Sequence, residues 1–122
     1  MLYTTLTVHG EEYKLRLGAR QLVDLERKFG SNPLSILGDL GKCDTEQDVM
    51  ACLSIDKFVS ILHASLQRYH HGITMDDVFN IYDDMLAEGF DIGKQLVLLS
   101  ELFQNCGLIP KVEDEEDSER KN

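Results

Sequence analysis

The sequence has no long apolar run and few basic residues. No uninterrupted apolar stretch approaches the roughly 20 residues that a membrane-spanning helix requires. The first ten residues lack a basic stretch followed by an apolar one, so we expect no secretory signal there. Twelve Lys and Arg residues stand against 22 Asp and Glu residues, which gives a formal net charge of −10. A surface this acidic disfavours unaided binding to nucleic acid or to an anionic membrane.

Cysteine is also scarce, and its placement argues against two kinds of site. Cys43, Cys52 and Cys106 are odd in number and include no Cys-x-x-Cys pair. We therefore expect ordinary free thiols, which suit a reducing cytoplasm better than a disulfide framework does. No grouping of Cys and His has the short paired spacing that is typical of a zinc site.

Sequence signatures of enzymes are missing as well. The chain has no nucleophile elbow, phosphate-binding loop or dinucleotide-binding fingerprint. The acidic pairs Asp76-Asp77 and Asp83-Asp84 lie two helical turns apart, roughly 10 Å along the axis, which is too far to share one metal ion. The sequence thus predicts a protein that is not an enzyme, with no catalytic residue, cofactor or metal. A metal-dependent enzyme is a distant alternative.

What is present is the composition of one globular domain. Of the 122 residues, 43% are apolar and 28% are charged, as in ordinary soluble proteins, and this length fits one domain. We expect that domain to span residues 1–110. Residues 111–122 hold one aliphatic side chain among many charged ones and are predicted to be an acidic disordered tail.

The beginning of the chain predicts a β-hairpin. Apolar and polar residues alternate with a period of two over residues 2–8 and 12–17. Between these strands, Gly10 supplies a residue that adopts the positive φ of a tight turn without strain. A lone hairpin is marginally stable in water, so later helices must cover its apolar face.

Glycine and proline divide the rest into helical segments. A first helix follows Gly18 and ends at Gly30, with Val23 on its inward side, and a short apolar segment follows Pro33. The polar stretch 42–48 is expected to be a mobile loop.

Longer apolar stripes predict three further helices. They cover residues 55–70, 75–88 and 92–106. Their expected N-caps are Ser54, Asp91, and Thr74 with Asp77 in a capping box. Ile55 and Tyr69 belong to the buried stripe of the first of these helices, and His70-His71 would interact with the carbonyl groups at its end. The predicted fold class is α+β, mainly helical: an N-terminal β-hairpin followed by a bundle of about four to five helices.

The last helix is more apolar than a peripheral helix needs to be. Its apolar residues, among them Val97, Leu98 and Phe103, cover more than one face. Two interpretations follow. The helix lies at the centre of the core, or part of its surface meets another subunit or a client protein.

Five segments of the chain resemble one protein family in their order and spacing. They are residues 13–17 (YKLRL), 25–30 (LERKFG), 32–34 (NPL), 61–74 (ILHASLQRYHHGIT) and 76–84 (DDVFNIYDD). Together they are similar to the tail assembly chaperones of long-tailed phages that infect Gram-positive bacteria.

This resemblance implies a non-enzymatic protein of the host bacterial cytoplasm that is absent from the mature virion. Such chaperones bind the tape-measure protein, help to recruit tail-tube subunits, and are expected to self-associate. A tape-measure protein exposes apolar helix faces, which would aggregate if they were left uncovered. The candidate partner-binding residues are Phe79, Tyr82, Tyr69, Leu98 and Phe103.

A second hypothesis belongs to another functional class. The acidic faces of the molecule could occupy a basic protein partner, as in a regulatory adaptor or a DNA mimic. Binding of that kind weakens steeply as the salt concentration rises, whereas binding to an apolar helical client depends weakly on salt.

Overall fold

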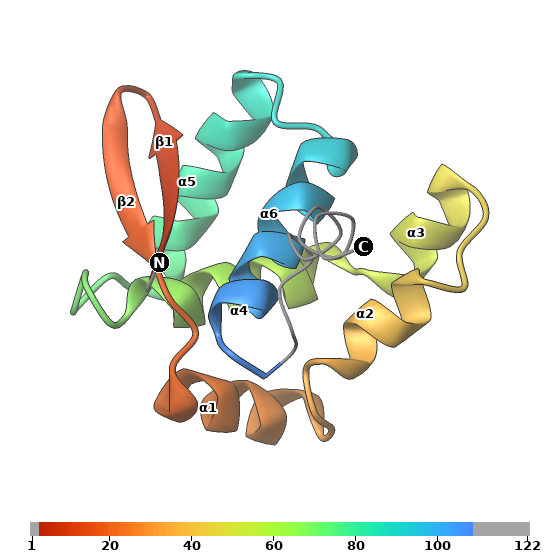
Figure 1. The fold of residues 1–122 in the computed structure, drawn as a ribbon. Helices are drawn as coiled ribbons and strands as arrows, with labels where there is room; N and C mark the ends of the chain where they lie inside the picture. Colours follow the sequence, from red (N-terminus) through yellow and green to blue (C-terminus); the bar gives the residue numbers. More distant parts are fainter. Residues whose placement is uncertain (1–2, 109–122) are drawn as a thin grey trace, which may run out of the picture.

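The computed structural model describes residues 3–108 and contains a two-stranded antiparallel sheet followed by six helices (Figure 1). This arrangement confirms the predicted α+β, mainly helical fold class. The predicted acidic tail, residues 111–122, lies outside the described residues.

The structure fixes the bounds of each element. The strands are β1 (Thr4–Val8) and β2 (Glu11–Leu15). The helices are α1 (Ala19–Phe29), α2 (Ser35–Leu40), α3 (Glu46–Cys52), α4 (Ile55–Leu66), α5 (Met75–Ala87) and α6 (Ile92–Asn105). Four of these helices were expected, and the short α2 corresponds to the apolar segment after Pro33.

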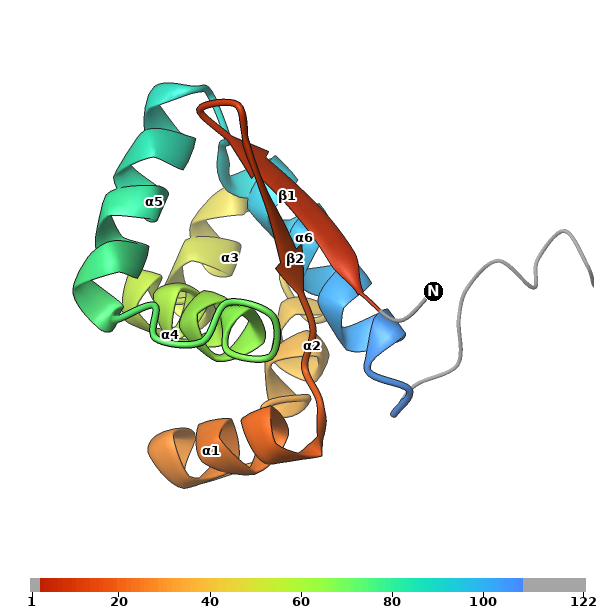
Figure 2. The ribbon, with the colours of Figure 1, turned by 90° about the vertical axis from the view of Figure 1, so that its left-hand side faces the viewer.

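The hairpin turn consists of His9 and Gly10, whose φ angles are 53° and 74°. Positive φ at both central positions is the signature of a type I′ turn, which matches the twist of the two strands. Alternate residues of β1 are buried, so one face of the hairpin packs on the helices. Figure 2 shows α6 passing behind the hairpin, and α6 contacts β1.

The most buried helix is α4, not the last helix. Eight of its 12 residues are buried, and it contacts α1, α5 and β2. The main-chain N–H of Arg16 donates to the carbonyl oxygen of Ser65 at 2.8 Å, which ties the end of the hairpin to this helix. Helix α6 buries one face, including Leu99 and Phe103, and leaves Val97 exposed.

Side-chain caps mark the start of the three longest helices, α4, α5 and α6. The Thr74 side chain accepts from the Asp77 N–H, and the Asp77 carboxylate accepts from the Thr74 N–H, which confirms the predicted capping box. These hydrogen bonds lower the pKa of Asp77. The predicted caps Ser54 and Asp91 also accept main-chain N–H groups, 3.1 Å away in each case.

The prediction of a loop over residues 42–48 was wrong in part, because α3 begins at Glu46. Thr45 caps this helix by accepting the Asp48 N–H at 3.1 Å, and Glu46 and Asp48 place negative charge in its first turn. The polar composition therefore marks a helix start rather than a continuous loop.

The helix predicted over residues 55–70 ends at Leu66. Tyr69 consequently leaves the buried stripe and is exposed, and Ile55 and Val23 are exposed as well, contrary to the predicted burial. At the end of the helix the main-chain N–H of His70 donates to the Leu66 carbonyl oxygen at 2.8 Å, but the His70 ring turns toward the hairpin. Its Nε2 accepts the Lys14 N–H at 3.0 Å, so it covers the outer edge of β2 instead.

Candidate functional site

Exposed apolar side chains gather at one place on the described surface. Met50, Ile55 and Leu86 are 59%, 63% and 48% exposed, and all three line the same groove. We call it the α3–α6 groove, because α3, the start of α4, the end of α5 and the start of α6 enclose it. Its volume is about 430 Å³. Several large exposed apolar side chains in one hollow are typical of a protein-binding surface.

The floor of the α3–α6 groove belongs to the core. Leu53, Phe58 and Tyr82 are buried and line the groove from below, with the rings of Phe58 and Tyr82 5.6 Å apart. The groove is therefore a rigid hollow with an apolar base, since its floor is fixed by packing.

The angle between α3 and α4 creates the open side of this groove. The two helices meet at 64°, with Leu53 in an extended conformation between them and Ser54 capping α4. Because of this bend, Met50 and Ile55 border the same space although they lie on different helices.

A buried hydrogen-bond network holds the opposite wall in place. The Tyr82 hydroxyl donates to Gln95 Oε1 at 3.1 Å, and Gln95 Nε2 donates to the Phe90 carbonyl oxygen at 3.0 Å. Gln95 is buried, so these bonds satisfy polar groups that water does not reach. The network joins α5, the turn after it and the first residues of α6.

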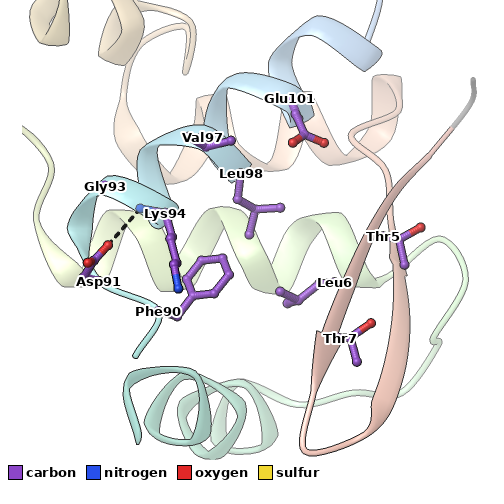
Figure 3. Close-up of a pocket in the computed structure, with 10 residues that line it drawn as sticks. All are labelled: Thr5, Leu6, Thr7, Phe90, Asp91, Gly93, Lys94, Val97, Leu98 and Glu101. Carbon is purple, nitrogen blue, oxygen red and sulfur yellow. Dashed lines mark hydrogen bonds between the residues drawn. The ribbon is translucent and has the colours of Figure 1, made fainter. Parts of the chain in front are cut away.

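A second groove runs along β1 and α6, which contact each other, and we call it the β1–α6 groove (Figure 3). Its volume is about 500 Å³. Leu6 and Leu98 point into it from the two sides, and the Phe90 ring lies beside the Lys94 side chain. Val97, which is 60% exposed, forms part of the helical wall.

Charged side chains border the β1–α6 groove. Asp91, Lys94 and Glu101 line it from α6 and the turn before it, while Thr5 and Thr7 line it from β1. The groove thus combines an apolar base with a polar rim, and one of its walls is a β-strand.

The structure disperses the five predicted partner-binding residues. Phe103 is fully buried in the core, so a partner could not reach it without opening the domain, and its assignment to a surface was wrong. Its large apolar side chain fills the interior of the bundle instead. Tyr82 and Leu98 are also buried, but each lines the base of a groove.

The other two predicted residues lie on separate exposed surfaces. Phe79 lies on the exposed side of α5. Tyr69 follows α4 and packs edge to face on Tyr3, with ring centroids 5.7 Å apart. Neither residue lines the two grooves, so their predicted contact with a partner remains a separate prediction.

Sequence reasoning found Tyr82 at the base of the α3–α6 groove but missed the exposed residues around it. Ile55 was assigned to a buried stripe, and Met50 lay outside every predicted helix. For the β1–α6 groove, the excess of apolar residues in the last helix gave a usable signal, since it included the exposed Val97.

The structure also brings together two cysteines that the sequence analysis treated as unrelated. Cys43 Sγ and Cys52 Sγ are 3.3 Å apart, near the junction of α2 and α3. Their hydrogen bond, with further contributions from burial and nearby carboxylates, raises the pKa of the Cys43 thiol to about 11. At neutral pH this sulfur is therefore a thiol rather than a reactive thiolate.

Oxidised glutathione is expected to join Cys43 and Cys52 in an intramolecular disulfide. Two thiols are oxidised and glutathione disulfide is reduced to two glutathione molecules. Of the three free thiols, one should then remain when the chain is titrated after denaturation. Because thiolate attack starts the exchange, the contribution of Cys43 should grow as pH rises toward its pKa. Three remaining thiols would contradict the expectation, and Cys52→Ser serves as the control that cannot form this bond.

One cluster of charges joins the hairpin turn to the end of α5. The His9 N–H donates to Glu88 Oε2 at 2.6 Å, and His9 Nε2 lies 3.2 Å from Asp84 Oδ1. Within residues 3–108, no group of three or more His, Cys, Asp or Glu side chains is arranged to hold a metal ion. The acidic residues here have a structural explanation, because they fix the hairpin turn against α5.

Comparisons of the chain with protein-family models, with curated proteins and with solved structures find no match. Among the described helices, none is long and apolar enough by itself to cross a membrane, and only α3 and α4 taken together as a bent pair reach that length and composition.

Proposed function

We propose that this chain is a non-enzymatic tail assembly chaperone of a long-tailed phage. In this proposal it acts in the host bacterial cytoplasm, binds the tape-measure protein and helps to recruit tail-tube subunits. The order and spacing of the five segments described above support the family, and the α3–α6 groove is the observation that carries the binding role.

The α3–α6 groove has the chemistry that an amphipathic helix needs. Apolar residues spaced three and four apart on a client helix could pack between Met50, Ile55 and Leu86 and rest on the buried floor. The polar face of that helix would remain in water. This mode of binding hides the apolar stripe of the client, which is the surface through which unassembled helices aggregate.

The expected strength of this contact suits a temporary cover. Covering a side chain that is about half exposed contributes about 1 kcal/mol, so the three exposed side chains give weak binding at one site. Several copies along one long client add their contributions, because each further contact within the same assembly is effectively intramolecular. Such a cover dissociates readily when the tail tube takes its place.

The test is co-expression with the tape-measure protein that, under this proposal, is encoded beside this chain. The wild-type chain should raise the soluble yield of that protein. Placing carboxylates in the groove with the double variant Met50→Asp and Leu86→Asp should weaken binding at least about tenfold, because a charge buried without a partner is costly. The soluble yield should then fall to that of the client expressed alone.

Val23→Asp is the matched control, because Val23 is an exposed apolar residue on α1, outside the groove. It should keep full chaperone activity. All variants should melt near the wild-type temperature, since surface substitutions change stability by roughly 0.5 kcal/mol or less. A wild-type chain that leaves the soluble yield unchanged would refute the proposal.

The alternative, an acidic adaptor or DNA mimic, is favoured only by the charge of the molecule. The formal net charge is −10, Asp83 and Asp84 lie on α5, and Asp84 contacts His9 in the hairpin turn. Raising NaCl from about 50 to about 500 mM separates the two functions, because salt screens exposed charges. Client binding through the groove should change little, whereas binding of a basic partner to the acidic faces should weaken by orders of magnitude.

A further inference from the structure

The hairpin geometry determines which main-chain groups of β1 point away from β2. In a type I′ turn the residues that flank the turn, Val8 and Glu11, are joined by a hydrogen bond. Hydrogen-bonded and non-hydrogen-bonded pairs alternate along an antiparallel ladder. Thr7↔Glu12 and Thr5↔Lys14 are therefore non-hydrogen-bonded pairs, and the N–H and C=O groups of these four residues point outward.

An independent contact supports this assignment. The Lys14 N–H donates to His70 Nε2 at 3.0 Å, which is possible only if it points away from β1. The His70 ring also packs on the Tyr13 ring, with centroids 5.5 Å apart. The outer edge of β2 is thus covered by a side chain of the segment after α4.

The outer edge of β1 has no such cover within residues 3–108. Among these residues, the N–H groups of Thr5 and Thr7 donate to no side chain or loop. Both threonines line the β1–α6 groove. An edge strand with free donors and acceptors is a template for another strand, and proteins usually block it with charge, proline or a covering segment. Threonine does none of these.

The groove beside this edge has the features of a strand-binding site. Leu6 and Leu98 lie at its base, and Val97 extends an exposed apolar wall along α6 (Figure 3). An extended segment places alternate side chains on opposite faces. One set would point to Leu6 and Leu98, while the main chain pairs with Thr5 and Thr7.

We propose that the outer edge of β1 binds one extended segment of a partner protein as a third strand, which lies beside β1 and against the exposed side of α6. Apolar side chains of the segment alternate with basic ones. The basic residues of the segment are complementary to the negative charge of this molecule. Its formal net charge is −10, and Asp91 and Glu101 outnumber Lys94 at the rim of the groove. The same charge opposes pairing with a second copy of the chain. This site is independent of the proposed chaperone function, since it uses another groove and a different mode of binding.

Amide hydrogen exchange of the free, full-length chain tests the open edge. Thr5 and Thr7 N–H groups should exchange at least about tenfold faster than the Leu6 N–H, which is bonded in the ladder. The probe is then the synthetic peptide Lys-Val-Thr-Val-Lys-Val-Thr-Val-Lys. At saturation it should slow the exchange of Thr5 and Thr7 at least about tenfold and leave Leu6 unchanged. Equal protection of all three amides in the free chain, through self-association or otherwise, would overturn the proposal.

Changes to the backbone separate strand pairing from nonspecific adhesion. Thr7→Pro removes an outward N–H at an edge position where proline is tolerated, and should weaken peptide binding at least about tenfold, whereas Thr7→Ala should stay within about twofold. If Thr7→Pro disrupts the hairpin, the same peptide with N-methylated valines provides the test on the wild-type chain. The N-methylated peptide should not bind the wild-type chain. If its affinity equals that of the unmodified peptide, pairing through the main chain is overturned.

Two further comparisons test the charge of the partner segment and which of the two grooves binds it. A peptide with Glu in place of each Lys should bind at least about tenfold more weakly, and equal binding would overturn the inferred charge of the partner. The double variant Met50→Asp and Leu86→Asp should bind the Lys peptide as the wild type does. Loss of client solubility with retained peptide binding therefore distinguishes the α3–α6 groove from the edge of β1.

Discussion

Replacing Phe103 with alanine is expected to lower the free energy of unfolding by about 3–5 kcal/mol, one of the largest effects that a single substitution in this chain should have. Phe103 has no exposed surface and packs in the core of the bundle. Truncation removes the favourable transfer of its ring from water and leaves a cavity that a close-packed interior fills only in part. The melting temperature should fall by about 15 °C or more.

Urea denaturation followed by circular dichroism would measure this change. Phe103→Leu keeps much of the volume and should cost less than half as much, while Val97→Ala on the exposed wall of the same helix should cost roughly 0.5 kcal/mol or less. A Phe103→Ala variant that keeps its stability but loses client binding would restore the surface role predicted from the sequence.

The second large effect is expected for Gln95→Leu, which should lower the free energy of unfolding by about 2–3 kcal/mol. Leucine fits the apolar surroundings, but it leaves the Phe90 carbonyl oxygen and the Tyr82 hydroxyl without their partner. Buried polar groups that lose their hydrogen bonds keep the full cost of desolvation.

A double-mutant cycle with Tyr82→Phe tests whether this loss belongs to the network. The hydroxyl and Gln95 share one hydrogen bond, so the two substitutions should cost less together than the sum of the single effects. Gln47→Leu makes the same change at an exposed position of α3 and should be nearly neutral. Additive effects of Tyr82→Phe and Gln95→Leu would argue against coupling through this bond.

Local signals in the sequence predicted much of the fold. Gly10 in the hairpin turn, the αL glycine at position 30 and the Thr74–Asp77 capping box all act within a few residues. Their geometry depends little on the rest of the chain, which is why the hairpin and the longer helices other than α4 were predicted close to their observed bounds.

The predictions from sequence were wrong for residues whose burial depends on elements distant in the chain. The spacing of apolar residues identifies a helix face, but it does not tell how far the neighbouring helices extend along that face. Ile55 lies on the apolar side of α4, but beyond the part that neighbouring elements cover. Tyr69 lies past the end of the helix. Phe103 was assigned to a surface for the opposite reason, because the bundle closes over it.

The sequence by itself determined the hairpin, the four longer helices and the acidic net charge. Only the tertiary structure decided where a partner could bind. Each groove is lined by residues from separate segments, such as Met50 with Leu86 and Leu6 with Leu98. Such residues meet only when the packed core sets the angle and separation of their elements, and no local pattern in the chain encodes that distance.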